Sequence, residues 1–197
     1  TGGFNSDYGG RISAVVDVKT REGNRKRLSG ILSASPFQAK ALIEGPIVPL
    51  KSDGGSSVSF VLTGKRGLIS QTDKSFYPYV NDSVGIPFDY QDVYGKLSFL
   101  TGNGSKLNVF GFNYTDGVDF PITDFGWESS GGGMDFTLIP TNSNTIVSGV
   151  LTVSGYKSHI EEADRLPRNS GISGYFAGLN FTNFGRNDEI KYGLELN

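Results

Sequence analysis

The chain has 197 residues with 18 Lys and Arg against 20 Asp and Glu, and it contains no Cys. It therefore lacks the positive charge typical of a nucleic-acid-binding domain, and it offers no disulfide framework, thiolate metal site or catalytic thiol. Its 28 Gly and 12% aromatic residues favour strands and turns over helices. Its apolar runs fall well short of the roughly 20 residues of a membrane-spanning helix, and no stretch has the pattern of a signal peptide.

Nine candidate strands follow one another from Arg25 to the end of the chain. They are Arg25–Ala34, Ala39–Ile47, Ser57–Ile69, Tyr90–Thr101, Lys106–Asp116, Phe125–Ile139, Thr145–Ser158, Ile172–Phe184 and Glu189–Asn197. Each is bounded by Gly, Asn, Asp, Ser or Pro, as expected of strands at hairpin spacing. Several exceed the mode of about 5 to 6 residues for soluble sheets and reach the length of a tilted transmembrane strand, about 9 to 11 residues. Strand length therefore favours a membrane barrel.

Apolar and polar residues alternate within these strands. Val58, Phe60 and Leu62 alternate with Ser57 and Ser59, and the stretches 147–154 and 175–182 repeat the pattern. A barrel with a wet interior needs such alternation, with apolar side chains towards lipid. A soluble sandwich shows it too, with the apolar face buried. Periodicity alone leaves both architectures open.

The connections between the strands alternate in length. Short turns rich in Gly and Asn at 102–105, 141–144 and 185–188 alternate with longer connections at 70–89, 117–124 and 159–171. Outer-membrane barrels have short turns at one end and long loops at the other, so this alternation also favours a barrel. The connections 35–38 and 48–56 are exceptions, since the first is short where a loop is expected and the second is long where a turn is expected.

Residues 8–24 read YGGRISAVVDVKTREGN, a long motif that precedes the first candidate strand. It resembles the last strand of the plug domain in TonB-dependent receptors, especially those of the Bacteroidota type. The stretches 42–47 and 62–66 are similar to the second and third barrel strands of the same family, in which an Arg pair commonly replaces Lys65-Arg66. These matches cover about the first third of the chain, and the remainder agrees in pattern.

The resemblance implies an all-β protein, an antiparallel transmembrane β-barrel of about 22 strands with a plugged lumen. In that scheme residues 1–24 are the C-terminal end of the plug domain, and residues 25–197 are the N-terminal part of the barrel. The implied function is TonB-dependent uptake of a nutrient ligand (siderophore, oligosaccharide or peptide) across the bacterial outer membrane. The implied partners are a TonB-type energy-coupling protein, outer-membrane lipid and, in some relatives, a surface lipoprotein. No cofactor and no nucleic acid are expected.

The sequence also departs from that family. It lacks a TonB-contacting segment, most of a plug and a terminal aromatic residue, so we expect an excerpt of a larger protein. Nine strands would leave an open edge whose backbone groups lipid cannot satisfy.

Candidate ligand-binding residues lie in two of the longer connections. Tyr77 and Tyr79 could stack on a sugar, peptide or chelate, or could pack within the loop or at the membrane interface. Asp119, Asp124 and Trp127 flank the next connection, where they could bind a ligand or serve as solvated charges beside an interfacial indole.

Candidate contacts between plug and barrel are Arg11, Lys65 and Arg66. Because side chains alternate along a strand, Lys65 and Arg66 are predicted to point to opposite faces, and one of them could meet plug carboxylates. The sequence does not indicate which.

No metal site or active site is predicted. Glu161, Glu162 and Asp164 lie near Arg165 and Arg168, a cluster that suits salt bridges or calcium, but the EF-hand order is missing. His159 is the single histidine, and no nucleophile, base and orienting group come together, so we expect the chain not to be an enzyme. An alternative function is a soluble or cell-surface β-sandwich that binds glycan through aromatics such as Tyr77, Tyr79 and Trp127.

Overall fold

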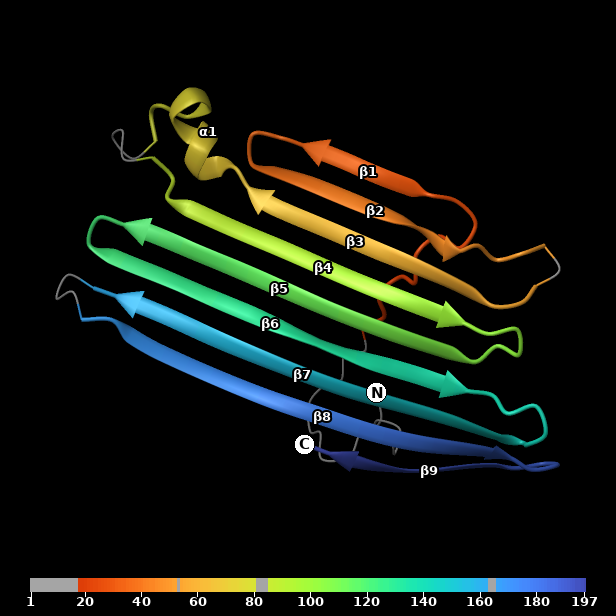
Figure 1. Ribbon diagram of the computed structural model, residues 1–197. Helices are drawn as coiled ribbons and strands as arrows, with labels where there is room; N and C mark the ends of the chain where they lie inside the picture. Colours follow the sequence, from red (N-terminus) through yellow and green to blue (C-terminus); the bar gives the residue numbers. More distant parts are fainter. Residues whose placement is uncertain (1–17, 53, 81–84, 163–165) are drawn as a thin grey trace.

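The computed structural model of the chain describes residues 18–52, 54–80, 85–162 and 166–197 (Figure 1). Nine antiparallel strands form a single open sheet in chain order, each strand hydrogen-bonded to the next. The strands are β1 (Ser29–Ala34), β2 (Gln38–Val48), β3 (Ser57–Gly67), β4 (Phe88–Leu100), β5 (Lys106–Phe120), β6 (Thr123–Leu138), β7 (Thr145–Glu161), β8 (Arg168–Phe184) and β9 (Glu189–Leu196), and a short helix α1 (Ile69–Phe76) follows β3. The predicted all-β class is confirmed.

All nine predicted strands are present, but several ends differ. Strand β1 begins at Ser29 rather than Arg25. The predicted long connection 117–124 is instead a tight turn at Pro121 and Ile122, because the ladder continues to the pair Phe120 and Thr123. Strands β7 and β8 likewise extend into the predicted connection 159–171. Backbone pairing satisfies the same hydrogen bonds whether the side chains are polar or apolar, so polar residues did not end these strands.

Two register rows show that the sheet has two chemically different faces. One row runs across β3–β9 through Phe60, Leu97, Val109, Met134, Leu151, Ala177 and Leu196. The adjacent row, which points to the other side, runs through Ser59, Ser98, Asn108, Asp135, Val150, Gly178 and Glu195. We call the side of the first row the apolar face and the side of the second row the polar face.

The apolar face is uncovered. Large side chains that remain more than a third exposed on it include Ile43, Leu62, Leu97, Val109, Leu151, Val153, Tyr175, Leu194 and Leu196. Among the described residues, the single buried large hydrophobic side chain is Val61, on the polar face. The chain exposes 13524 Å², whereas a compact monomer of this mass would expose about 9,000 Å². The described residues form one layer, and the two stacked sheets of the sandwich alternative are not observed in them.

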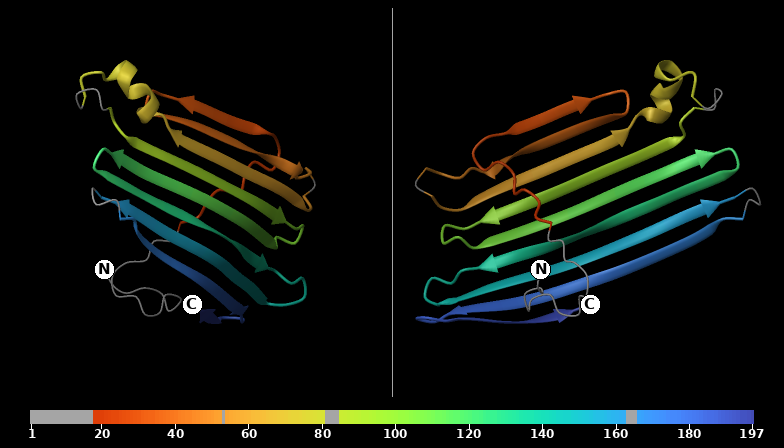
Figure 2. Two further views of the ribbon diagram at one scale, coloured as in Figure 1. Left: turned by 60° about the vertical axis from the view of Figure 1, so that its left-hand side comes forward. Right: turned by 180° about the vertical axis from the view of Figure 1, so that it is seen from behind.

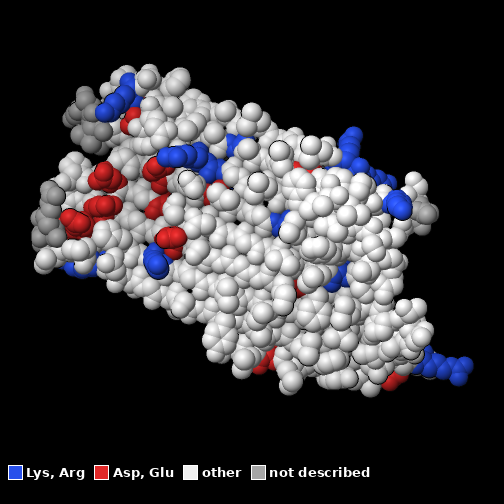
Figure 3. All heavy atoms as spheres, viewed as in Figure 1, with Lys and Arg blue, Asp and Glu red and all other residues white. Residues whose placement is uncertain are grey.

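Charged side chains gather on the apolar face at the end of the sheet nearest α1, over the ends of β4–β7, while most of that face is uncharged (Figure 3). The register explains the gathering, since Glu128 opposes Lys157, and Asp124 lies between Asp119 and Glu161. One face therefore changes along the strands from charged to apolar.

Residues 18–28, which we call the crossing segment, run over the polar face of the first strands (Figure 2). The helix α1 lies at one end of the sheet, beside the turn between β1 and β2 (Figure 1), where Thr72 Oγ1 donates to the Pro36 carbonyl at 2.5 Å. In the described part of the chain, no helix is long and apolar enough to pass through a membrane.

Candidate functional site on the polar face

The crossing segment is held by hydrogen bonds from side chains of β4. The Lys96 ammonium donates to the carbonyl and to Oγ1 of Thr20 at 3.1 and 3.2 Å, and the hydroxyls of Thr20 and Tyr94 lie 2.6 Å apart. Lys96 is only 8% exposed. A charge this deeply placed requires polar partners, and Thr20 supplies two oxygen acceptors.

Further contacts fix the segment at Glu22 and Gly23. The Ser59 hydroxyl donates to the Glu22 carbonyl at 2.6 Å, and the Glu22 carboxylate lies 3.2 Å from Lys106 Nζ and pairs with Arg25. Gly23 has φ +82°, and a Cβ there would lie 2.5 Å from the Phe60 carbonyl oxygen. Only glycine allows the backbone to approach the sheet this closely in that conformation.

Lys65 and Arg66, two of the predicted plug–barrel contacts, point to opposite faces as predicted. Among the described residues, their carboxylate partners are on β4: Asp92 at 3.0 Å for Lys65 and Asp89 at 3.7 Å for Arg66. Arg11 lies outside the described residues. The lysines that reach the crossing segment are Lys96 and Lys106, which the sequence did not single out.

Polar atoms lacking a partner are concentrated beneath and beside the crossing segment. Among the described residues, four buried side-chain atoms make no hydrogen bond: Glu44 Oε2, Ser57 Oγ, Ser98 Oγ and Asn108 Oδ1. All four lie on the polar face of β2–β5. Buried polar atoms normally have hydrogen-bond partners, so we expect polar partners for these four atoms outside the described residues.

A second group of residues on the polar face lies nearer α1, beyond the crossing segment. We call it the aromatic platform and define it as Tyr90, Tyr114, Asp116, Trp127, Ser129, Tyr156 and Ser158. The register places it in two adjacent rows on this face. One row runs Tyr90, Asp116, Trp127, Ser158, and the other runs Asp92, Tyr114, Ser129, Tyr156. Aromatic and polar residues therefore alternate both along and across the strands, as on a checkerboard.

Two of the platform tyrosines are held by hydrogen bonds: Tyr90 donates to Gln38 Oε1 at 2.6 Å, and Tyr114 donates to Asp116 Oδ2 at 2.8 Å. The Tyr90 ring also packs over Gly67, and the Trp127 ring lies 5.0 Å from the Phe125 ring. Asp116 Oδ1 and the indole N–H of Trp127 have no hydrogen-bond partner among the described residues. Tyr156 is 42% exposed. The platform therefore offers ring faces, a carboxylate and hydroxyls to a ligand.

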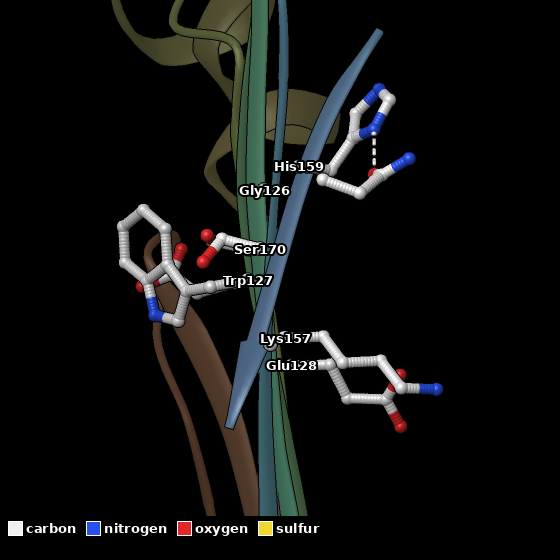
Figure 4. A pocket seen from close by; sticks show the side chains of 10 residues that line it. Gly126, Trp127, Glu128, Lys157, His159 and Ser170 are labelled. Atoms are coloured by element: carbon white, nitrogen blue, oxygen red, sulfur yellow. Dashed lines mark hydrogen bonds between the residues drawn. The ribbon is translucent and has the colours of Figure 1, made fainter.

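The residues around Trp127 do not form one cavity (Figure 4). Trp127 and Ser170 lie on one side of the strands, while His159, Lys157 and Glu128 lie on the other. His159 Nδ1 is 2.8 Å from Asn169 Oδ1 on that opposite side. Because the sheet itself separates the two groups, one ligand cannot contact both.

The predicted ligand-binding residues fall in three places. Tyr77 lies beside α1 with its ring 5.8 Å from Phe37 and 6.4 Å from Tyr79. Asp119 and Asp124 oppose each other on the apolar face, whereas Trp127 points to the polar face. Tyr77 and Tyr79 are thus together, the two aspartates are together, and Trp127 is apart from both pairs.

The acidic stretch after β7 forms no described metal site. Glu161 opposes Asp124 across the strands, and Glu162 forms an ion pair with Arg168. Asp164 and Arg165 lie outside the described residues. Within the ranges that the structure describes, no three His, Asp or Glu side chains are grouped so that they could hold a metal ion.

Comparisons of the chain with family models, with curated proteins and with solved structures find no match.

Proposed function

We propose that the chain is the N-terminal part of a plugged transmembrane β-barrel in the bacterial outer membrane, which takes up a nutrient ligand with energy delivered by a TonB-type protein. The apolar face contacts lipid, the polar face lines the lumen, and the crossing segment is the end of the plug. The ligand is a siderophore, an oligosaccharide or a peptide. The proposed role is transport, in which no covalent bond of the ligand is broken.

The observation that carries this proposal is the exposed apolar face. Rows of aliphatic and aromatic side chains cross nearly the whole sheet without any covering layer in the described residues. Monomeric soluble proteins rarely expose apolar patches larger than a few hundred Å², whereas a barrel wall must do so within the hydrocarbon. Lipid is a partner that covers such a surface without a second protein layer.

The polar face supports the same arrangement from the other side. Lys96, Glu44 and Asn108 are nearly inaccessible there, and such side chains are costly in hydrocarbon but suit a lumen occupied by a plug. The charged rows at the α1 end of the apolar face would then lie above the hydrocarbon, at the level of the lipid headgroups.

The proposal requires further strands. β1 and β9 are the edges of the sheet, and their unpaired backbone groups cannot remain in lipid. Strands of the complete protein would pair with these two edges and close the wall.

Two neighbouring positions test which face meets lipid. Val153 and Ser154 are both exposed but point to the apolar and polar faces, respectively. Because the chain has no Cys, each could be replaced by Cys in the complete protein and spin-labelled in native membranes. We expect the label at Val153 to collide with lipid-soluble oxygen, and the label at Ser154 to be protected from it. Equal access of a water-soluble nickel chelate to both labels would contradict the proposal.

Uptake tests the transport step. Radiolabelled ferrichrome, cellohexaose and a pentapeptide would be supplied to cells with and without the gene, and with the plug's coupling segment intact or deleted. We expect gene-dependent uptake of one probe that is lost with the coupling segment. Equal uptake with and without that segment would contradict energy-coupled transport.

A further inference from the structure

The aromatic platform has the chemistry of a surface for an uncharged, hydroxyl-rich ligand. Four aromatic rings alternate with Asp116, Ser129 and Ser158 in two rows on one face of β4–β7. The backbone positions of rings on alternate strands are about 10 Å apart, which is twice the spacing of neighbouring strands. The Tyr90 ring leans over Gly67 towards Gln38 on β2, so the row through Tyr114, Ser129 and Tyr156 carries the pattern. A ligand lying across β5–β7 would therefore meet ring, hydrogen-bonding group and ring in turn.

Sugars in a chain present the matching pattern. Each pyranose has C–H groups that pack on an aromatic face and hydroxyls at its edge that donate to carboxylates and serines. Asp116 is well suited to this role, because Tyr114 binds only its Oδ2 and its Oδ1 has no partner among the described residues. The indole N–H of Trp127 is available in the same way to a hydroxyl oxygen.

The charges around the platform argue against an anionic ligand. Of the cations nearest the platform, Lys65 lies 3.0 Å from Asp92, and Arg168 forms an ion pair with Glu162. Lys40 opposes Lys65 on β2, one strand further from the rings. Asp116 adds a negative charge between the rings of Tyr90 and Trp127. A phosphate, a uronic acid or an anionic iron chelate would have to displace these pairs and approach a carboxylate.

We propose that the aromatic platform binds a neutral oligosaccharide. This inference rests on the proposed transport function and selects one of its three ligand classes. The platform lies on the polar face between the α1 end of the sheet and the crossing segment, whose Thr20 meets Tyr94 at the next row. A glycan that enters the lumen from the α1 end would reach the rings before it reaches the crossing segment.

Binding of defined oligosaccharides to the complete protein in detergent tests the inference. The probes are cellohexaose, maltohexaose and xylohexaose, with hexagalacturonate and ferrichrome as the charged and non-sugar counterparts. We expect at least one neutral hexasaccharide to bind, and Trp127→Ala to weaken it about tenfold or more, as the loss of one stacked ring implies. Trp127→Phe retains a ring face, so its affinity should stay within about threefold.

The matched control is Lys157→Ala. Lys157 is one residue from Ser158 but points to the opposite face (Figure 4), so its removal should leave the affinity unchanged. The inference is overturned if none of the three neutral probes binds, if hexagalacturonate or ferrichrome is the probe that binds, or if Lys157→Ala weakens binding as much as Trp127→Ala. The spin-label test at Val153 and Ser154 distinguishes failure of this inference from failure of the proposed transport function. If Val153 contacts lipid but no glycan binds, only this inference is wrong. If Val153 is exposed to water, the transport function is wrong as well.

Discussion

The polar face has two halves that differ in burial. Over β2–β5, where the crossing segment lies, Glu44, Ser59, Val61, Lys96 and Ser98 are all less than a tenth exposed. Over the described residues of β6–β9, the buried positions are two glycines, so no side chain there is buried. The strands of the two halves have the same regular pairing. Burial therefore follows the crossing segment and not the sheet.

This difference shows how little a single sheet can bury by itself. A sheet has two faces, and each needs a second layer before its side chains leave the solvent. In β2–β5 eleven residues of crossing chain supply part of that layer, whereas no described segment crosses the polar face of β6–β9, into which the aromatic platform extends. Among the described residues, the crossing segment therefore accounts for the buried side chains of the polar face.

The largest expected effect comes from Gly23→Ala. The new Cβ would lie 2.5 Å from the Phe60 carbonyl oxygen, at a residue with φ +82°, so the crossing segment must lift away from β3. We expect the free energy of local opening of residues 20–25 to fall by about 2 to 4 kcal/mol, the sum of backbone strain and lost contacts. Amide hydrogen exchange would measure it.

Gly54→Ala is the matched control for that change. Gly54 also has a positive φ, +87°, but a Cβ there meets nothing within 4 Å. It should carry only the conformational cost of about 1 kcal/mol and leave exchange of the crossing segment unchanged. Equal loss of protection in the two variants would mean that close approach to Phe60 does not matter.

Lys96→Met should have the next largest effect. The substitution removes both hydrogen bonds to Thr20, which stabilise the closed segment. In the native protein, opening of the segment lets the lysine ammonium regain water, and this gain in hydration offsets part of the loss of those hydrogen bonds. We expect the opening free energy of the crossing segment to fall by about 1 to 2 kcal/mol. Lys65→Met, on the same face but paired with Asp92, should leave it unchanged. The reverse order of the two variants would favour the contact predicted from the sequence.

The strands were predictable because two local signals agree along most of the chain. Alternation of apolar and polar residues marks the two-faced strands, and Gly and Asn mark the short turns at 102–105, 141–144 and 185–188. The helix α1 was not predicted, because contacts from Pro36 and Phe37 in the turn between β1 and β2 hold it. The long connection 48–56 also reflects a distant contact, since Leu50 N–H donates to the Arg25 carbonyl.

The candidate sites were harder to predict because they depend on register across turns. At the turn, the even-numbered Phe120 of β5 opposes the odd-numbered Thr123 of β6. Odd-numbered residues of β5 therefore share a face with even-numbered residues of β6. Asp119 and Asp124 therefore lie together, while Trp127 points to the other side. A period of two predicts which residues share a face within one strand. It does not predict which residues of the next strand lie on that same face, because this depends on the register between the strands. The contacts of Lys96 with Thr20 span 76 positions of sequence, and no local signal marks them.

Ser59→Ala and Ser98→Ala sharpen the comparison within a single row. The two serines oppose each other on β3 and β4 and are 0% and 1% exposed. Ser59 donates to the Glu22 carbonyl, whereas Ser98 Oγ has no partner in the described chain. We expect Ser59→Ala to lower the opening free energy of the crossing segment by about 1 kcal/mol, and Ser98→Ala to be neutral or slightly stabilising. Equal losses for both would show that Ser98 Oγ has a partner outside the described residues.

Lys106→Met should have the smallest effect. Its ammonium lies 3.2 Å from Glu22, but the two side chains are 42% and 31% exposed, so water and salt screen the pair. We expect a loss of about 0.5 kcal/mol in the opening free energy at low ionic strength, and almost none at about 1 M salt, where the screening length falls to about 3 Å. Lys191→Met removes a similar exposed pair on β9, with Glu189, and should change nothing in the crossing segment at either salt concentration. A salt-independent loss for Lys106→Met would mean that its stem packs against the segment, and the crossing chain would then be held by burial at both lysines rather than at Lys96 alone.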